Sequence, residues 1–111
     1  MKELTKTEEI LLLSIWRLKD KAYGVRIRQH ISKVIKKQFT YGNLYSALKQ
    51  LVLKNYVKKR PGEGVPQRRG RRRIYYTLTP EGLEALKEAQ EMNASLWANV
   101  PKYAFEKNKS P

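Results

Sequence analysis

One basic segment in the middle of the chain does most to constrain its fold. Residues 67–76 read QRRGRRRIYY, with five arginines in six positions around Gly70. Alternating β-type patterns flank this segment at residues 56–60 and 72–78, and the stretch between the two patterns is rich in proline and glycine. Glycine and proline interrupt strands and favour turns. The sequence therefore predicts a β-hairpin with a long basic loop, a wing, over about residues 61–73.

Three amphipathic stretches before the hairpin predict helices. Thr5 and Glu8 have the spacing of a capping box and precede a broad apolar stripe, which predicts a first helix over about 6–18. A second stripe predicts a helix over about 23–35. Thr40 is placed to cap a third helix, over about 40–54, whose apolar residues recur at helical spacing.

A fourth helix follows the hairpin. Thr79 and Pro80 supply a cap and a first-turn proline, and the helical pattern runs to about Val100. The predicted fold class is mostly α with a small β-hairpin (α+β), arranged as a winged helix-turn-helix with an added C-terminal helix. The predicted parts are a winged helix-turn-helix over 1–79, a dimerisation helix over 80–100, and a loose polar tail over 101–111.

The charge of the chain predicts a polyanionic partner. The formal net charge is +14 over 111 residues, and the residues up to Pro80 hold 20 lysines and arginines against 5 acidic residues. Such an excess on a small domain favours binding to nucleic acid phosphates. The single histidine, His30, lies within a predicted helix with no obvious nucleophile beside it, and no nucleotide-binding motif occurs. We therefore expect no enzymatic activity and no cofactor.

The sequence predicts neither a metal nor a membrane partner. Cysteine is absent, which excludes disulfides and thiolate metal sites. The glutamates of the fourth helix have no companion histidine or cysteine, so a solvated acidic face is the expected role. The longest apolar run, residues 10–13, is too short to span a bilayer, and no signal-peptide pattern precedes it. We expect a cytoplasmic protein.

Three segments carry a resemblance to a known family. They read AYGVRI at 22–27, GNLYSALKQL at 42–51 and RIYYTLTPEG at 73–82. In this order and spacing, over roughly residues 4–100, they resemble the signature blocks of PadR-type transcriptional regulators. The resemblance implies a bacterial or archaeal homodimeric DNA-binding regulator, commonly a repressor, that dimerises through its C-terminal helix. The chain departs from the family at Ser46, where proline is frequent, and at Ile74, where lysine is frequent.

The predicted DNA contacts come from the third helix and the wing. In a winged helix-turn-helix the third helix enters the major groove of a double-stranded DNA operator. An asparagine there can form two hydrogen bonds with adenine. The candidates on the third helix are Thr40, Tyr41, Asn43, Tyr45, Ser46 and Lys49. The candidates for phosphates or a narrow minor groove are Arg68, Arg69, Arg71, Arg72 and Arg73. The alternative is a solvated helix face and a loop that only aids solubility.

The fourth helix carries a predicted dimer interface. Its candidate residues recur at alternating spacings of three and four, and they are Leu86, Ala89, Asn93, Leu96 and Val100. A two-fold dimer would match a pseudo-palindromic operator. The alternative is packing of this helix on the chain's own first helix. Met92, Leu96 and Trp97 are candidates to line a pocket for a small, flat, apolar aromatic inducer, with plain interface packing of the tryptophan as the alternative.

Two other functions remain compatible with the sequence. A nonspecific or architectural DNA-binding protein would draw most of its affinity from the wing. An RNA-binding winged helix would use the wing and exposed tyrosines for recognition of shape and for stacking. Two measurements distinguish these functions from sequence-specific regulation. Substitution of Asn43 changes the affinity for all sequences equally in a nonspecific binder, and excess RNA displaces an RNA-binding protein from DNA.

Overall fold

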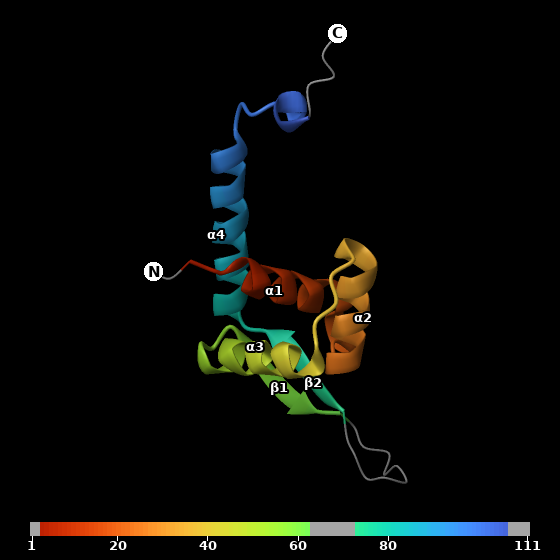
Figure 1. The fold of residues 1–111 in the computed structure, drawn as a ribbon. Coiled ribbons are helices and arrows are strands. Elements are labelled where there is room, and N and C mark those ends of the chain that lie inside the picture. Colours follow the sequence, from red (N-terminus) through yellow and green to blue (C-terminus); the bar gives the residue numbers. More distant parts are fainter. Residues whose placement is uncertain (1–2, 63–72, 107–111) are drawn as a thin grey trace.

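The helices and strands follow the predicted order in a computed structural model, which describes residues 3–62 and 73–106. Figure 1 shows α1, α2 and α3 gathered beside the β-hairpin, whereas α4 leaves this body and extends away from it. The elements are α1 (Lys6–Leu18), α2 (Gly24–Ile35), α3 (Tyr41–Leu53), β1 (Val57–Pro61), β2 (Ile74–Leu78) and α4 (Pro80–Trp97), with short 3₁₀ helices at Lys19–Lys21 and Lys102–Phe105. The fold class is therefore the predicted one.

The apolar core lies between α1, α2, α3 and the inner face of the hairpin. Its fully buried side chains are Leu11, Leu12, Ile15, Ile27, Ile31, Leu44, Leu48, Leu51 and Val57. Burial of a side chain of this size contributes about 1.5–3 kcal/mol relative to leaving it exposed. Tyr76 is buried in the same cluster from β2. Because both strands supply core residues, the base of the hairpin is fixed against the helices.

Threonine caps begin three of the helices at the predicted positions. Thr5 and Glu8 form a complete capping box on α1: the Glu8 amide donates to the Thr5 hydroxyl at 3.1 Å, and the Thr5 amide donates to the Glu8 carboxylate at 2.9 Å. The carboxylate of Glu8 also pairs with Lys54 at the end of α3. Burial raises the pKa of Glu8, but the bonds from Lys54 and Thr5 outweigh burial and hold this pKa below its ordinary value. Glu8 therefore ties α1 to α3 as a carboxylate.

The start of α4 is locked onto the turn between α3 and β1. The Thr79 hydroxyl accepts a hydrogen bond from the Gly82 amide at 2.9 Å and donates one to the Asn55 carbonyl at 2.7 Å. The Thr79 amide donates to the Tyr56 carbonyl at 3.1 Å. A Cβ atom at Gly82 would collide with that same carbonyl oxygen. Only glycine allows α4 to approach the backbone of the α3–β1 turn this closely.

Two features of the C-terminal region differ from the sequence-based expectation. The helix α4 ends at Trp97, because Ala98 takes an extended conformation and Asn99 a left-handed one with φ of 65°. Val100 therefore lies beyond the helix, and its assignment to the helical seam was wrong. Residues 102–105 form a 3₁₀ helix, where the sequence predicted a loose tail. The ring of Phe105 packs edge-on against Trp97 at 5.8 Å between centroids.

We predict that Gly82→Ala destabilises the protein by about 1–3 kcal/mol, although alanine is the better helix former. The added Cβ meets backbone, which cannot rotate away as a side chain can. Gly42→Ala is the matched control, since a Cβ there meets nothing within 4 Å, and we expect it to raise stability by up to about 1 kcal/mol. Urea denaturation of both variants measures the difference. Equal stabilities would contradict the prediction.

Candidate nucleic-acid interface

The helix α3 buries one face and exposes the other. Leu44, Leu48 and Leu51 lie in the core. The sequence-predicted contact residues Tyr41, Asn43, Tyr45, Ser46 and Lys49 are all exposed. Thr40 is exposed as well, and its hydroxyl also caps the helix by accepting from the Asn43 amide at 3.1 Å. The five candidates on α3 itself therefore lie outside the core, and the sixth stands at its first turn.

An arginine from α2 holds the first turn of α3. The Nε of Arg28 donates to the Phe39 carbonyl at 2.5 Å. Its guanidinium lies over the Tyr41 ring, 4.4 Å from the centroid, and Tyr41 stacks on Tyr45 at 6.3 Å. A Cβ at Gly24 would collide with the Tyr45 hydroxyl, so this ring sits directly on the start of α2. Sequence reasoning missed Arg28, because its partner is a backbone carbonyl eleven residues away.

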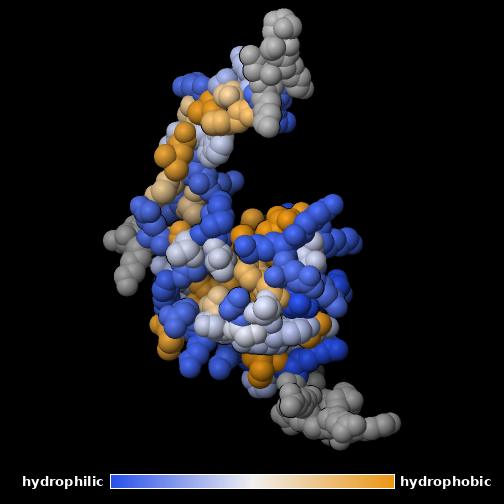
Figure 2. Space-filling model, viewed as in Figure 1, coloured by the Kyte–Doolittle hydropathy of each residue, from blue (hydrophilic) through white to orange (hydrophobic). Residues whose placement is uncertain are grey.

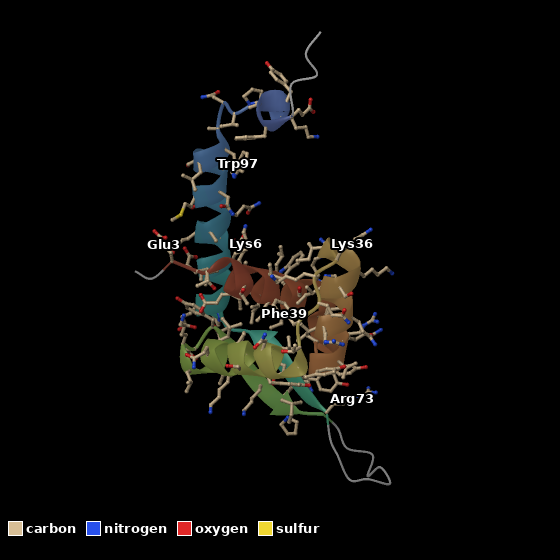
Figure 3. The ribbon with its side chains drawn as sticks, in the orientation of Figure 1. Glu3, Lys6, Lys36, Phe39, Arg73 and Trp97 are labelled. Atoms are coloured by element: carbon tan, nitrogen blue, oxygen red, sulfur yellow. The ribbon has the colours of Figure 1, made fainter. Side chains whose placement is uncertain are left out.

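A second cluster of tyrosine and arginine side chains forms the base of the wing. Tyr23 and Tyr75 pack edge to face, with centroids 5.4 Å apart. Arg73 lies over the Tyr23 ring at 4.3 Å, and Arg60 lies over the Tyr75 ring at 4.9 Å. The pKa of the exposed Arg73 guanidinium is raised, mainly by a hydrogen bond with the Tyr75 side chain and then by the charge interaction with Tyr23. We call these four residues the wing-base cluster, and Figure 3 labels Arg73 at the end of the hairpin where β2 begins.

The wing arginines are only partly within the described residues. Arg73 lies in the wing-base cluster, whereas Arg68, Arg69, Arg71 and Arg72 lie outside the ranges that the structure describes. Sequence reasoning did not single out Arg60, because a lone arginine in an alternating strand pattern looks like any solvated position. Its cross-strand partner Tyr75 gives it a defined place.

A groove between α3 and the hairpin adds two lysines to this surface. Its volume is about 450 Å³, and Lys49 and Lys59 line it. Tyr76 forms part of its wall, and burial first and Tyr45 second raise the pKa of this phenol. Tyr76 is the buried tyrosine of the pair at 75 and 76, which alternation along a strand places on opposite faces. Lys59 is a further basic residue that the sequence did not single out.

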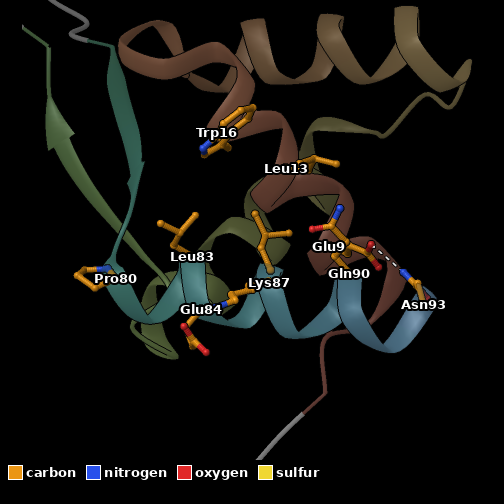
Figure 4. Close-up of a pocket in the computed structure, with 10 residues that line it drawn as sticks. Glu9, Leu13, Trp16, Pro80, Leu83, Glu84, Lys87, Gln90 and Asn93 are labelled. Carbon is orange, nitrogen blue, oxygen red and sulfur yellow. Dashed lines mark hydrogen bonds between the residues drawn. The ribbon is translucent and has the colours of Figure 1, made fainter. Parts of the chain in front are cut away.

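A larger groove separates α1 from α4, away from the wing. Its volume is about 760 Å³, and Figure 4 shows Leu13, Trp16, Leu83 and Lys87 facing it. Leu13, Trp16 and Leu83 are 45%, 47% and 50% exposed, which is unusual for such large apolar side chains side by side. Asn93 donates to Glu9 at 3.2 Å across one end of the groove. The groove is an apolar surface that residues 3–62 and 73–106 leave uncovered.

The candidate dimer residues do not share one environment. Leu86 packs against the core, and Asn93 bonds to Glu9 of α1, so this part of the seam is used within the chain. Ala89 is half-buried. Leu96 is exposed, and Val100 lies beyond the helix. The packing of α4 on its own first helix, which the sequence left open as an alternative, therefore accounts for two of the five positions.

The candidate inducer residues are also separated. Met92 lines a small hollow of about 200 Å³ between α4 and the N-terminal segment. Trp97 instead contacts Phe105. Figure 2 shows the apolar side chains at this end of α4 as a patch distinct from those of the main body. Within one chain, the described residues do not bring Met92, Leu96 and Trp97 to a common cavity.

The described residues contain neither a metal-type cluster of side chains nor a helix of membrane-spanning character. In the ranges 3–62 and 73–106, no three histidine, aspartate or glutamate side chains lie together as metal ligands would. None of the helices in these ranges has the length and apolar content needed to cross a bilayer.

The fold and this surface define a class of protein. Three helices followed by a hairpin, with the third helix exposed beside it, form a winged helix-turn-helix. A model of the transcriptional regulator PadR-like family matches residues 12–88. The chain belongs to this family, whose members are transcriptional regulators and not enzymes. None of the curated proteins compared with the chain matches it.

Solved structures agree with this assignment. A PadR family transcription regulator from hypervirulent Clostridium difficile is 32% identical, with a TM-score of 0.63, over 80% of this chain and 88% of that one. A transcriptional regulator from Clostridium thermocellum is 28% identical, with a TM-score of 0.65, over 86% and 92%. A PadR-like regulator from Bacillus cereus shares the fold at 21% identity and a TM-score of 0.68, over 81% and 82%.

We predict that Arg28→Ala loosens the first turn of α3. The variant loses the hydrogen bond to Phe39 and the contact with Tyr41, so local opening should become easier by about 1–2 kcal/mol. Amide hydrogen exchange at Asn43 and Leu44 measures this change. Arg26→Ala is the control, because Arg26 is an exposed arginine of the same helix. Identical exchange in the two variants would refute the role of Arg28.

Proposed function

We propose that this protein is a sequence-specific double-stranded DNA-binding regulator that acts as a repressor. One observation carries the proposal: Asn43 and Ser46 project from an exposed face of α3 that is flanked by lysine and arginine side chains. Asparagine and hydroxyl side chains read base edges, whereas lysine and arginine contact phosphates. The repressor role rests on the family resemblance, since repression is common among PadR-type regulators.

In the proposed complex, α3 enters the major groove and the wing follows the backbone or the adjacent minor groove. Tyr41 and Tyr45 support this placement as well as contacting DNA, because their stacked rings fix the start of α3 against α2. Lys49 and Lys59 flank the opposite side of the helix. Phosphate contacts on both sides of a reading helix set its register along the duplex.

A homodimer is the second part of the proposal. The groove between α1 and α4 exposes Leu13, Trp16 and Leu83 together, and Leu96 and Trp97 extend the apolar surface along the far end of α4. A second copy related by a two-fold axis would cover both regions and would bring the recognition helices to successive major grooves.

An inducer site belongs to the same proposal. A flat apolar aromatic molecule would bind where the second subunit completes the surface around Met92, Leu96 and Trp97, since one chain leaves these residues apart. Binding there would favour a dimer geometry in which the two α3 helices no longer match successive grooves.

We predict that Asn43→Ala reduces the preference for operator over scrambled duplex by about 1–3 kcal/mol. Lys49→Ala should instead weaken both duplexes equally and reduce the salt slope by about 0.9. Fluorescence anisotropy at two salt concentrations, with the upstream intergenic duplex, a scrambled duplex and an RNA of equal length, measures these effects. Equal loss on both duplexes for Asn43→Ala would favour nonspecific binding, and displacement by RNA would favour an RNA-binding function.

We predict that Leu83→Lys weakens the dimer at least tenfold, because it places a charge in the apolar groove. Leu53→Lys is the control, since Leu53 is an equally large, exposed apolar residue on α3. Sedimentation equilibrium gives the dissociation constant of each variant. A dimer that survives Leu83→Lys as well as Leu53→Lys would place the interface elsewhere.

A further inference from the structure

The wing-base cluster of Tyr23, Tyr75, Arg60 and Arg73 lies outside the recognition helix, and only Arg73 of the four belongs to the basic segment that the charge pattern pointed to. We propose that Tyr23 and Tyr75 are positioning residues that hold Arg60 and Arg73 as a preorganised pair of phosphate contacts. This inference rests on the proposed DNA-binding function and deepens it. The contacted chemistry is the sugar-phosphate backbone of a duplex, irrespective of its sequence.

The backbone fixes both tyrosine rings. Tyr75 is the direct cross-strand partner of Arg60, so the two side chains share one face of the hairpin. Tyr23 forms an isolated antiparallel bridge with Tyr75 just before α2 begins. The amide of the neighbouring Tyr76 donates to the Ala22 carbonyl at 2.8 Å. Because Tyr76 is itself buried in the core, the cluster is anchored to the rigid body of the fold.

Contact with a ring face leaves most of the hydrogen-bonding edge of each guanidinium for another partner, besides the hydrogen bond between Arg73 and the Tyr75 side chain. Arg73 and Arg60 lie over ring faces at 4.3 Å and 4.9 Å from the centroids. A guanidinium over a ring face still directs its N–H groups outward in its own plane. Within residues 3–62 and 73–106 the ion pairs are Lys6–Glu9 and Lys54–Glu8. In this part of the chain, no carboxylate neutralises either arginine of the cluster.

The location of the cluster suits contact with a backbone beside the reading helix. Tyr23 directly precedes Gly24, on which the Tyr45 ring of α3 sits. Gly62 closes the other side, where its amide donates to the Arg73 carbonyl at 2.6 Å. The cluster therefore joins the start of α2, next to the recognition helix, to the root of the wing. Ordering of long arginine side chains before binding reduces the entropy lost on binding.

The test uses the full chain and a scrambled duplex, since the contact carries no sequence information. Tyr23→Leu retains every charge, so we expect affinity to fall about two- to fivefold while the salt slope stays unchanged. Tyr23→Phe keeps the ring and should bind like the unmodified protein. Arg73→Ala should reduce the salt slope by about 0.9. In the Arg73→Ala background, most of the effect of Tyr23→Leu should disappear.

Three outcomes would overturn the inference. They are undiminished binding by Tyr23→Leu, an unchanged salt slope in Arg73→Ala, and an equal effect of Tyr23→Leu with and without Arg73. If Tyr23→Leu does not fold, Arg60→Lys replaces it, because lysine keeps the charge and loses the planar group. Weaker binding by Arg60→Lys at an unchanged salt slope supports the inference, and binding equal to that of the unmodified protein refutes it. If the variants behave as expected but the protein binds operator and scrambled duplex equally, sequence-specific regulation alone is refuted. If the protein binds no duplex, both the proposed function and the role of the wing-base cluster are refuted.

Discussion

The close approach of Gly82 to the carbonyl of Tyr56 is the constraint on which the arrangement of the elements depends. It brings the first turn of α4 onto the turn that ends α3 and begins β1. Thr79 fastens the same junction with its amide and its hydroxyl. The ends of α3 and β2 and the starts of β1 and α4 therefore meet at a few backbone atoms. The direction of α4, and with it the apolar groove against α1, is set relative to the exposed face of α3.

The distribution of charge partners is the second organising feature. With 24 basic residues against 10 acidic ones, carboxylates cannot pair with most of the cations. At the start of α3 and at the base of the wing, arginines lie on tyrosine rings instead. A ring face orders a guanidinium without cancelling its charge. The surface keeps its positive potential and still presents side chains in defined positions, which suits association with a polyanion.

Local signals in the sequence predicted much of the fold. The threonines at 5, 40 and 79 marked the starts of α1, α3 and α4, because a capping side chain acts within three residues. Alternation along β2 places the tyrosines at 75 and 76 on opposite faces, and only the structure shows that Tyr76 is the buried one. The end of α4 was predicted less well: the helix was expected to reach about Val100 but ends at Trp97. The left-handed conformation of Asn99 has no strong signature in the sequence.

Contacts between distant segments were beyond the sequence pattern. Arg28 bonds to a backbone carbonyl, and Arg60 gains its place only when strand pairing sets Tyr75 opposite it. The periodic residues of α4 divide between intrachain contacts and exposure, because helical spacing gives one stripe without naming the surface that covers it. Leu86 and Asn93 face the chain's own body, whereas Leu96 is exposed.

The firm attachment of α4 also gives the molecule a mechanical property. The helix has 18 residues and extends about 27 Å at 1.5 Å per residue, and much of it stands clear of the main body (Figure 1). Because backbone contacts at Gly82 and Thr79 hold its base, a rotation of the winged helix that keeps these contacts carries α4 with it. A tilt of about 10° displaces the far end by about 5 Å over this length. Conversely, a small displacement of the far end of α4 changes the orientation of α3 as long as the junction at Gly82 is kept.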